Sequence, residues 1–153
     1  MKVYFIRHAI AMEREEWQDD DLKRPLTKDG IKKFKSFFKK ISKNLKKPDL
    51  LIASEAERSI ATAKIIAKLY DIDYKIDNRI NPGSDIMQYK LVLDEMADNN
   101  VNSIAIVGHE PDLSNFISFY IAETALSLKL KKGAIVCIKD KVLYGLIQPD
   151  MLK

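Results

Sequence analysis

Two histidines occur in this chain of 153 residues, and each comes just after a run of apolar residues. His8 follows the run Val3 to Ile6, and His109 follows the run Ser103 to Val107. β-Branched apolar runs are typical of buried parallel strands, and open α/β sheets bind ligands at the carboxyl ends of their strands. We therefore expect the two imidazoles to share one site. Two unrelated structural histidines are the alternative.

Two arginines add to this pattern. Arg7 directly precedes His8, and Arg58 lies near the start of a predicted helix. A phosphoryl group spreads negative charge over its oxygens in the transition state, and guanidinium groups are suited to bind that charge. A neutral imidazole can attack phosphorus to form a covalent phosphohistidine, and neighbouring arginines favour the neutral ring. These residue types indicate phosphoryl-transfer chemistry.

Helix starts are predicted beside both strand ends. Ser54 and Glu57 have the spacing of a capping box, which places Arg58 in the first turns of its helix. Pro111 is expected at the first helical position, just after His109. Both helices would then direct their partially positive N-termini toward the strand ends, where an anion can bind.

Strand-like and helical patterns alternate along the chain, which favours an α/β layered fold. A final strand is expected to pair with the one before it through a hairpin turn at Asp140 and Lys141. The predicted strands are Val3 to Ile6, Leu50 to Ala53, Tyr74 to Ile76, Ser103 to Val107, Ala134 to Ile138 and Val142 to Ile147. The predicted helices are Lys28 to Asn44, Glu55 to Tyr70, Asp85 to Asp98 and Pro111 to Ile121.

Composition favours one globular domain over residues 1–153, with 46% hydrophobic and 31% charged residues. The single cysteine, Cys137, stands in an apolar run, so we expect a buried thiol and no internal disulfide. No apolar stretch is long enough to cross a bilayer, and the first residues already form a strand pattern. We expect a cytoplasmic protein with no membrane partner.

Charge is distributed unevenly along a chain of net charge +4. The segment Lys32 to Lys47 is predicted to be an amphipathic helix with a solvated basic face. A patch for nucleic acid or an acidic partner is the alternative, but no aromatic stacking pattern or binding signature accompanies the lysines, and no nucleic-acid partner is expected. Acidic residues between Glu13 and Asp21 predict an exposed loop that shapes access to the site.

Four segments resemble, in order and spacing, the motifs of the histidine phosphatase superfamily, also called phosphoglycerate-mutase-like. They resemble most the small phosphohistidine phosphatase branch of that family. The segments are Arg7-His8-Ala9, Arg24-Pro25-Leu26-Thr27 with Gly30, Ser54 to Arg58 followed by Thr62-Ala63, and Val107-Gly108-His109-Glu110-Pro111. The resemblance implies a three-layer sandwich, in which helices flank a mostly parallel central sheet.

The resemblance also implies roles. His8 would be the nucleophile that becomes phosphorylated, while Arg7 and Arg58 would bind the phosphoryl oxygens. His109 would complete the pocket by donating a hydrogen bond to a phosphoryl oxygen. Thr62 lies on the same helical face as Arg58 and is expected to support the site or pack in the core rather than to bind the phosphoryl group. No cofactor and no metal are expected.

Two departures from the family pattern stand out. Ala9 replaces the glycine of the hallmark Arg-His-Gly motif, which narrows the approach to phosphate and is tolerated if the backbone needs no positive φ. A carboxylate that protonates the leaving oxygen in many members has no clear equivalent, and Asp85 and Glu110 are the weak candidates. An imidazole leaving from a P–N bond is less basic than an alkoxide, so the missing acid favours phosphohistidine as substrate.

The sequence therefore predicts a metal-independent phosphatase that acts on histidine-phosphorylated signalling proteins through a phosphohistidine at His8. Its partner would be a phosphorylated protein of the histidine-phosphotransfer type or a small phosphorylated compound. Two alternatives stay open, a phosphatase for a small phosphorylated metabolite and a non-catalytic phosphate-binding module. No Gly-rich phosphate loop, cysteine phosphatase loop or zinc ligand spacing points to another chemistry.

Overall fold

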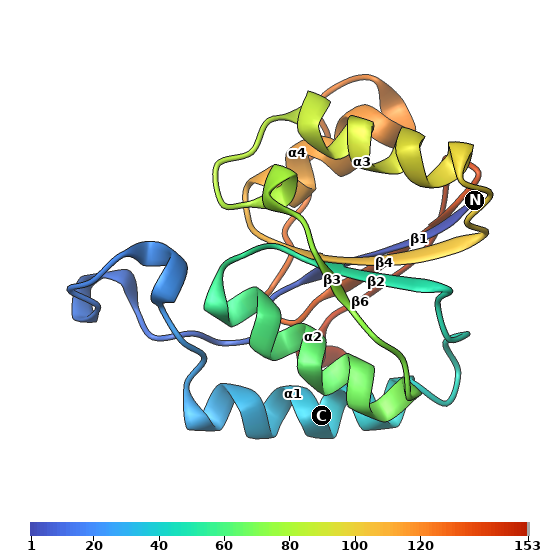
Figure 1. Ribbon diagram of the computed structural model, residues 1–153. Helices are drawn as coiled ribbons and strands as arrows, with labels where there is room; N and C mark the ends of the chain where they lie inside the picture. The colour runs from blue at the N-terminus through green and yellow to red at the C-terminus, as the bar shows by residue number, and fades with distance from the viewer. Residues whose placement is uncertain (153) are drawn as a thin grey trace.

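The computed structural model describes residues 1–152 and contains one six-stranded sheet (Figure 1). The strands are β1 (Lys2–Arg7), β2 (Leu50–Ala53), β3 (Lys75–Ile76), β4 (Ser103–Gly108), β5 (Ile135–Lys139) and β6 (Val142–Ile147). The helices are α1 (Lys28–Ile41), α2 (Glu57–Tyr70), α3 (Ile86–Asp98) and α4 (Asp112–Ala122). The order across the sheet is β3-β2-β4-β1-β5-β6, with β1 to β4 parallel and β5 antiparallel to both neighbours.

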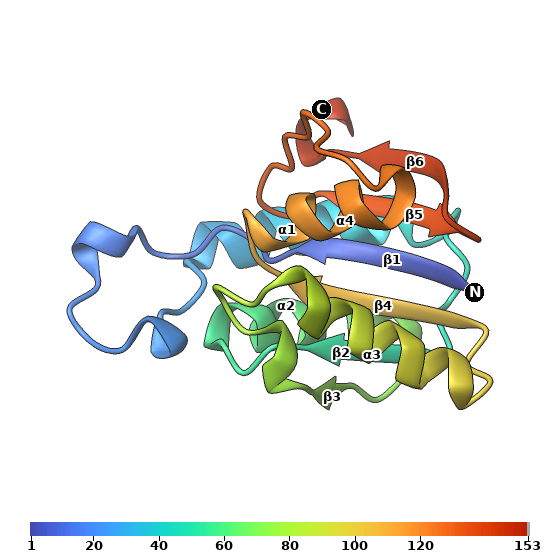
Figure 2. The same ribbon diagram turned by 90° about the horizontal axis from the view of Figure 1, so that it is seen from above.

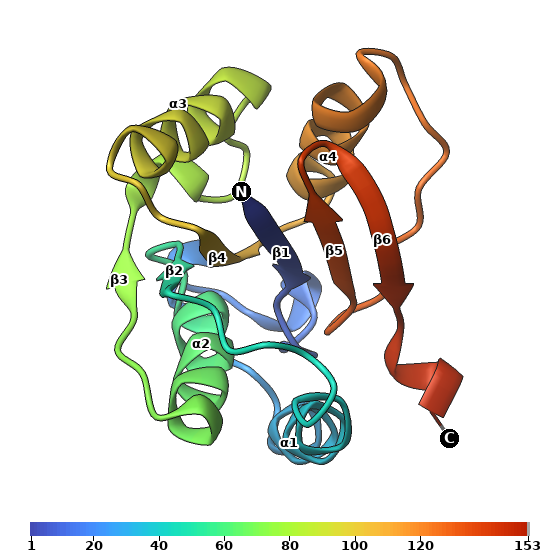
Figure 3. The ribbon, with the colours of Figure 1, turned by 90° about the vertical axis from the view of Figure 1, so that its right-hand side faces the viewer.

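Helices cover both faces of this sheet, α1 and α2 on one side and α3 and α4 on the other (Figure 3). Side chains of β1 alternate between the two layers: Tyr4 and Ile6 join the cluster beneath α1 and α2, and Val3 and Phe5 join the opposite cluster. Because both faces are buried, the strand needs apolar residues at every position. The predicted three-layer sandwich with a mostly parallel sheet is confirmed.

The predicted hairpin between the last two strands is also confirmed. Asp140 and Lys141 both have positive φ, 50° and 63°, which suits the two central residues of a tight turn between antiparallel strands. Within residues 1–152, no helix is long and apolar enough to span a membrane.

Element boundaries differ from the predictions by up to three residues. α1 ends at Ile41 rather than Asn44, and α2 begins at Glu57 rather than Glu55. The expectation of a buried Cys137 was wrong, because this thiol on β5 is half-buried.

The chain that leaves β1 is held by the start of α1. Thr27 caps this helix, its Oγ1 accepting a hydrogen bond from Gly30 N at 2.9 Å, and its own N–H donates to Ile10 O. A Cβ at Gly30 would lie 2.2 Å from Ile10 O, so only glycine permits this approach. Residues 13–23 then project beyond the carboxyl ends of the parallel strands (Figure 2).

Candidate functional site

His8 is fixed by backbone contacts at the end of β1. Its N–H donates to Gly108 O at 3.1 Å, and its ring Nδ1 donates to Ala9 O at 2.7 Å. A neutral imidazole carries one proton, so this bond leaves the lone pair on Nε2. His8 is 5% exposed, and Nε2 is the ring nitrogen that keeps a free lone pair.

His109 lies beside His8, with ring centroids 5.2 Å apart. The parallel register pairs Arg7 with Gly108, so the residues that follow the two strands come together at one edge. Ser54 Oγ is 2.7 Å from His109 Nε2, while His109 Nδ1 is buried and has no hydrogen-bond partner within residues 1–152. When Ser54 donates to Nε2, the neutral ring holds its proton on Nδ1 and can donate it to an oxyanion.

Both imidazoles are neutral at neutral pH. The pKa of His8 is lowered to about 3, mainly by burial and also by the charges of Arg58 and Arg7, while the hydrogen bond to Ala9 acts in the opposite direction. Burial likewise lowers the pKa of His109 to about 2, with contributions from His8 and the same arginines. Arginines were expected to favour the neutral ring, and the structure adds that desolvation is the larger cause.

Arg7 and Arg58 hold their guanidinium groups in different ways. Arg7 donates to Leu130 O at 2.6 Å, whereas Arg58, only 2% exposed, donates to Asp21 O at 2.7 Å and to Asp21 Oδ2 at 2.8 Å. The Nε atoms of both arginines are buried and lack a partner within residues 1–152. Buried unpaired donors are costly, and such donors next to a neutral imidazole fit a site that binds an anion.

Asp21 and Arg24 belong to this site, although the sequence pattern predicts no role for either residue there. Asp21 Oδ1 accepts from Arg24 Nε at 2.9 Å, so its carboxylate joins Arg24 to Arg58. Burial opposes ionisation of Asp21, but the hydrogen bonds from Arg24 and Arg58 lower its pKa overall. The only signal in the sequence is its place three residues before Arg24, and the acidic pattern from Glu13 to Asp21 wrongly predicts that this residue is fully exposed.

Thr62 ties the histidine motif to α2. Its Oγ1 accepts from Ala9 N at 3.0 Å and donates to Arg58 O at 2.7 Å, and its side chain is fully buried. The supporting position expected for Thr62 is therefore observed. Ala9 is 2% exposed, and its φ is not among the positive ones, so alanine fits the backbone at this position without strain.

Two helix starts differ from their predictions. The capping box was wrong: Ala56 is the N-cap of α2 without a side-chain cap, and Ser54 Oγ accepts from Ala56 N and contacts His109 instead. Pro111 is the N-cap of α4 rather than its first helical residue. Arg58 still lies in the first turn of α2.

The two weak candidates for a general acid have different surroundings. Asp85 caps α3, accepting from Gln88 N at 2.9 Å. Glu110 accepts a hydrogen bond from Ser114 N at 3.0 Å. Burial raises the pKa of Glu110, although the hydrogen bond from Ser114 and the charge of Arg7 act to lower it. Glu110 therefore lies close enough to Arg7 for their charges to interact.

The residues brought together can hold a tetrahedral oxyanion between guanidinium groups and place a neutral imidazole beside it. Within residues 1–152, no group of three or more histidine, cysteine or acidic side chains is arranged to hold a metal ion.

Comparison with known proteins gives the family. The model of the histidine phosphatase superfamily (branch 1) matches residues 3–82, and the chain belongs to this superfamily. The fold is similar to that of the protein histidine phosphatase SixA in complex with tungstate, with a TM-score of 0.89, 17% identity and full coverage of both chains.

Two further similarities extend this result. A phosphoserine phosphatase variant from Entamoeba histolytica in complex with phosphoserine has a TM-score of 0.75 and 16% identity, over 99% of each chain. An uncharacterized protein of Picosynechococcus is 25% identical over 142 residues, which cover 92% of this chain and 86% of that protein. At these identities, the structural similarities establish the fold alone.

Proposed function

We propose that this protein is a phosphohistidine phosphatase of one domain, residues 1–153, that dephosphorylates histidine-phosphorylated proteins through a phosphohistidine at His8. The observation that carries the proposal is the His8 ring, whose Nδ1 is bound to Ala9 O and whose Nε2 is left as the lone-pair nitrogen of a neutral imidazole. Membership in the histidine phosphatase superfamily and the SixA-like fold support it.

In the first step, the Nε2 lone pair of His8 attacks phosphorus as the P–N bond of the substrate breaks. The bonding pair goes to the substrate imidazole, which takes a proton from solvent. Arg7 and Arg58 bind the phosphoryl oxygens, and His109 donates a hydrogen bond to one of them. Water then attacks phosphorus, the bond to Nε2 breaks, and orthophosphate leaves with the His8 ring neutral again.

The carboxylate of Asp21 favours a P–N substrate. Asp21 is bound by Arg24 and Arg58 and has a lowered pKa, so it is a poor proton donor at neutral pH. An alkoxide leaving group needs such a donor more than an imidazole does.

One observation favours a second candidate, a phosphatase for phosphate monoesters of small metabolites. Glu110 has a raised pKa and interacts with the charge of Arg7, as a general acid in this site would. Under this alternative, Glu110→Gln would reduce ester turnover, whereas under the first proposal it leaves turnover of phosphohistidine nearly unchanged.

The direct test is a brief incubation with radiolabelled phosphoramidate followed by denaturation. We expect an acid-labile, alkali-stable phosphoenzyme that is absent in His8→Ala. Label that persists in this variant would refute the role of His8, and binding of phosphate without any label would favour the non-catalytic module. A parallel assay of a phosphohistidine protein against p-nitrophenyl phosphate tests the substrate, since faster turnover of the ester would overturn the first choice.

A further inference from the structure

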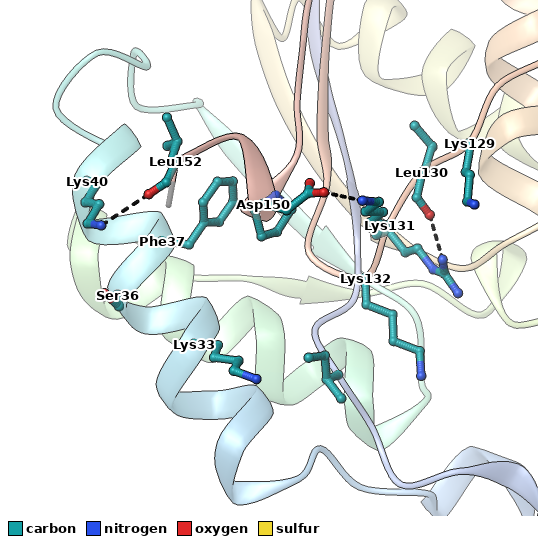
Figure 4. A pocket seen from close by; sticks show the side chains of 13 residues that line it. Lys33, Ser36, Phe37, Lys40, Lys129, Leu130, Lys131, Lys132, Asp150 and Leu152 are labelled. Carbon is teal, nitrogen blue, oxygen red and sulfur yellow. Dashed lines mark hydrogen bonds and ion pairs between the residues drawn. The ribbon is translucent and has the colours of Figure 1, made fainter.

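A groove of 670 Å³ opens beside the candidate site and includes Arg7 in its wall. Its walls come from α1, from residues 129–132 and from residues 149–152 (Figure 4). We call it the basic groove because six cationic side chains line it, namely Arg7, Lys33, Lys40, Lys129, Lys131 and Lys132. The proposed function requires none of these lysines.

The groove is strongly positively charged. Asp150 is the one acidic residue among the residues that line it, and it pairs with Lys131. The whole chain has a net charge of only +4, so the positive excess of the protein is concentrated here. The amphipathic α1 contributes Lys33 and Lys40 to the groove, while its other lysines lie outside it.

The lysine heads can exchange their present partners at small cost. Lys33 pairs with Asp29 at 2.7 Å and Lys132 with Glu13 at 3.3 Å, and both carboxylates are more than half exposed. Exposed ion pairs contribute at most about 1 kcal/mol each, so incoming carboxylates can replace them. Lys129 has no hydrogen bond or ion pair within residues 1–152.

The groove also has apolar walls, to which the partly exposed Ile10, Pro149 and Leu152 contribute. The groove has room for much more than a single small ligand, since one water molecule occupies about 30 Å³ in the liquid. A basic rim above apolar walls suits a segment that carries both acidic and apolar side chains. Bases of nucleic acid bind by stacking on exposed aromatic rings, and Phe37 is only 5% exposed.

From this geometry we propose that the basic groove binds an acidic, partly apolar segment of the phosphorylated protein substrate while its phosphohistidine occupies the site at Arg7. The inference rests on the proposed function for the identity of its occupant. Since Arg7 contributes to both regions, such a segment would extend directly from the phosphoryl group into the groove.

The test measures binding without turnover, so that it does not depend on catalysis. A fluorescent peptide of alternating glutamates and leucines, without a phosphorylated residue, is titrated with the full chain and followed by anisotropy. A groove variant combines Lys33→Ala, Lys129→Ala and Lys132→Ala. A matched variant combines Lys35→Ala, Lys39→Ala and Lys64→Ala, three exposed lysines outside the groove.

We expect the native chain and the matched variant to bind equally, and the groove variant to bind about tenfold more weakly. Added salt should weaken binding, and a peptide with glutamines in place of glutamates should not bind. Equal binding by all three proteins would overturn the proposal, as would tighter binding of a single-stranded oligonucleotide or of tripolyphosphate than of the peptide. Failure of the proposed function is a separate result, the absence of a phosphoenzyme at His8.

Discussion

On one side of the candidate site, His8 and His109 follow paired residues of two parallel strands, and the sheet fixes their backbones. On the other side, Asp21 comes from the projecting segment 13–23 and reaches Arg58 through hydrogen bonds at 2.7 and 2.8 Å. The first side is arranged by the fold before any ligand binds. The second is held by an ion pair that a phosphoryl group would have to share or displace.

This difference separates two requirements of phosphoryl transfer. The nucleophile needs a fixed direction, which the sheet and the bond from His8 Nδ1 to Ala9 O supply. The cationic donors need compensation while no phosphate is bound, and Asp21 supplies it to Arg58 and Arg24. Removing a group that fixes His8 should therefore change mainly kcat, whereas removing the charge of Asp21 should change mainly the affinity for phosphate.

Arg58→Ala should have the largest effect. The variant removes a buried guanidinium next to the candidate phosphoryl site and leaves Asp21 with Arg24 as its remaining close partner. We expect kcat/KM for phosphohistidine to fall by about 10²- to 10³-fold, as for the loss of one donor to a transition-state oxyanion. Arg58→Lys, which keeps the charge but not the planar pair of donors, should recover only part of this loss. Near-native activity of Arg58→Ala would exclude the assigned role.

Stability should fall as the pH is lowered, because of the two buried histidines. Both rings are neutral in the folded state, with pKa values of about 3 and 2, whereas the ordinary value is 6.5. Below the ordinary value, the unfolded chain takes up protons that the folded chain does not, so this contribution is complete above pH 6.5 and is lost on acidification.

Urea denaturation should show the free energy of unfolding falling by about 2 kcal/mol per histidine between pH about 6.5 and about 4.5. The double variant His8→Asn with His109→Asn is the control and should have a flatter profile over this range. Identical slopes for the two proteins would mean that the imidazoles are protonated in the folded state.

Thr62→Val tests how the backbone that holds His8 is fixed after β1. Valine keeps the shape of threonine but leaves Ala9 N–H without its acceptor, at a cost of about 1–2 kcal/mol in the free energy of unfolding. Because Ala9 O accepts from the His8 ring, we expect kcat to fall about tenfold with little change in KM. The exposed Thr124→Val is the matched control and should be neutral. A rise in KM alone would show that Thr62 acts on phosphate binding.

The comparison also explains what could be predicted from the sequence. Apolar runs and turn residues are local signals, so the strands, the hairpin at Asp140 and Lys141, and the meeting of His8 with His109 could all be predicted. The family resemblance supplied the roles proposed for Arg7 and Arg58.

Contacts between distant side chains could not be predicted in this way. Asp21 meets Arg58 across 37 residues, and Ser54 meets His109 across 55. The spacing of Ser54 and Glu57 is that of a local cap, but the fold uses the Ser54 hydroxyl for a buried histidine instead. A local pattern cannot show this choice, because His109 lies far away in the sequence, just after β4.

Asp21→Asn should have the smallest effect, and it directly tests the role of the projecting segment 13–23. Asparagine retains the shape and an acceptor for Arg58 but removes the negative charge that competes with phosphate. We expect inorganic phosphate to inhibit the variant about fivefold more tightly than the native enzyme, as expected for the loss of one partly exposed ion pair. Asp19→Asn, an exposed carboxylate that pairs with Lys23, is the control.

Weaker inhibition in Asp21→Asn would contradict the interpretation that the charge of Asp21 competes with phosphate for Arg58. The carboxylate would then serve mainly to orient Arg58, and both sides of the site would be arranged before phosphate binds. Tighter inhibition together with an unchanged free energy of unfolding would support the difference between the histidines, which the sheet fixes, and Arg58, which an ion pair holds. The charge of Asp21 would then oppose phosphate binding without being needed for the fold.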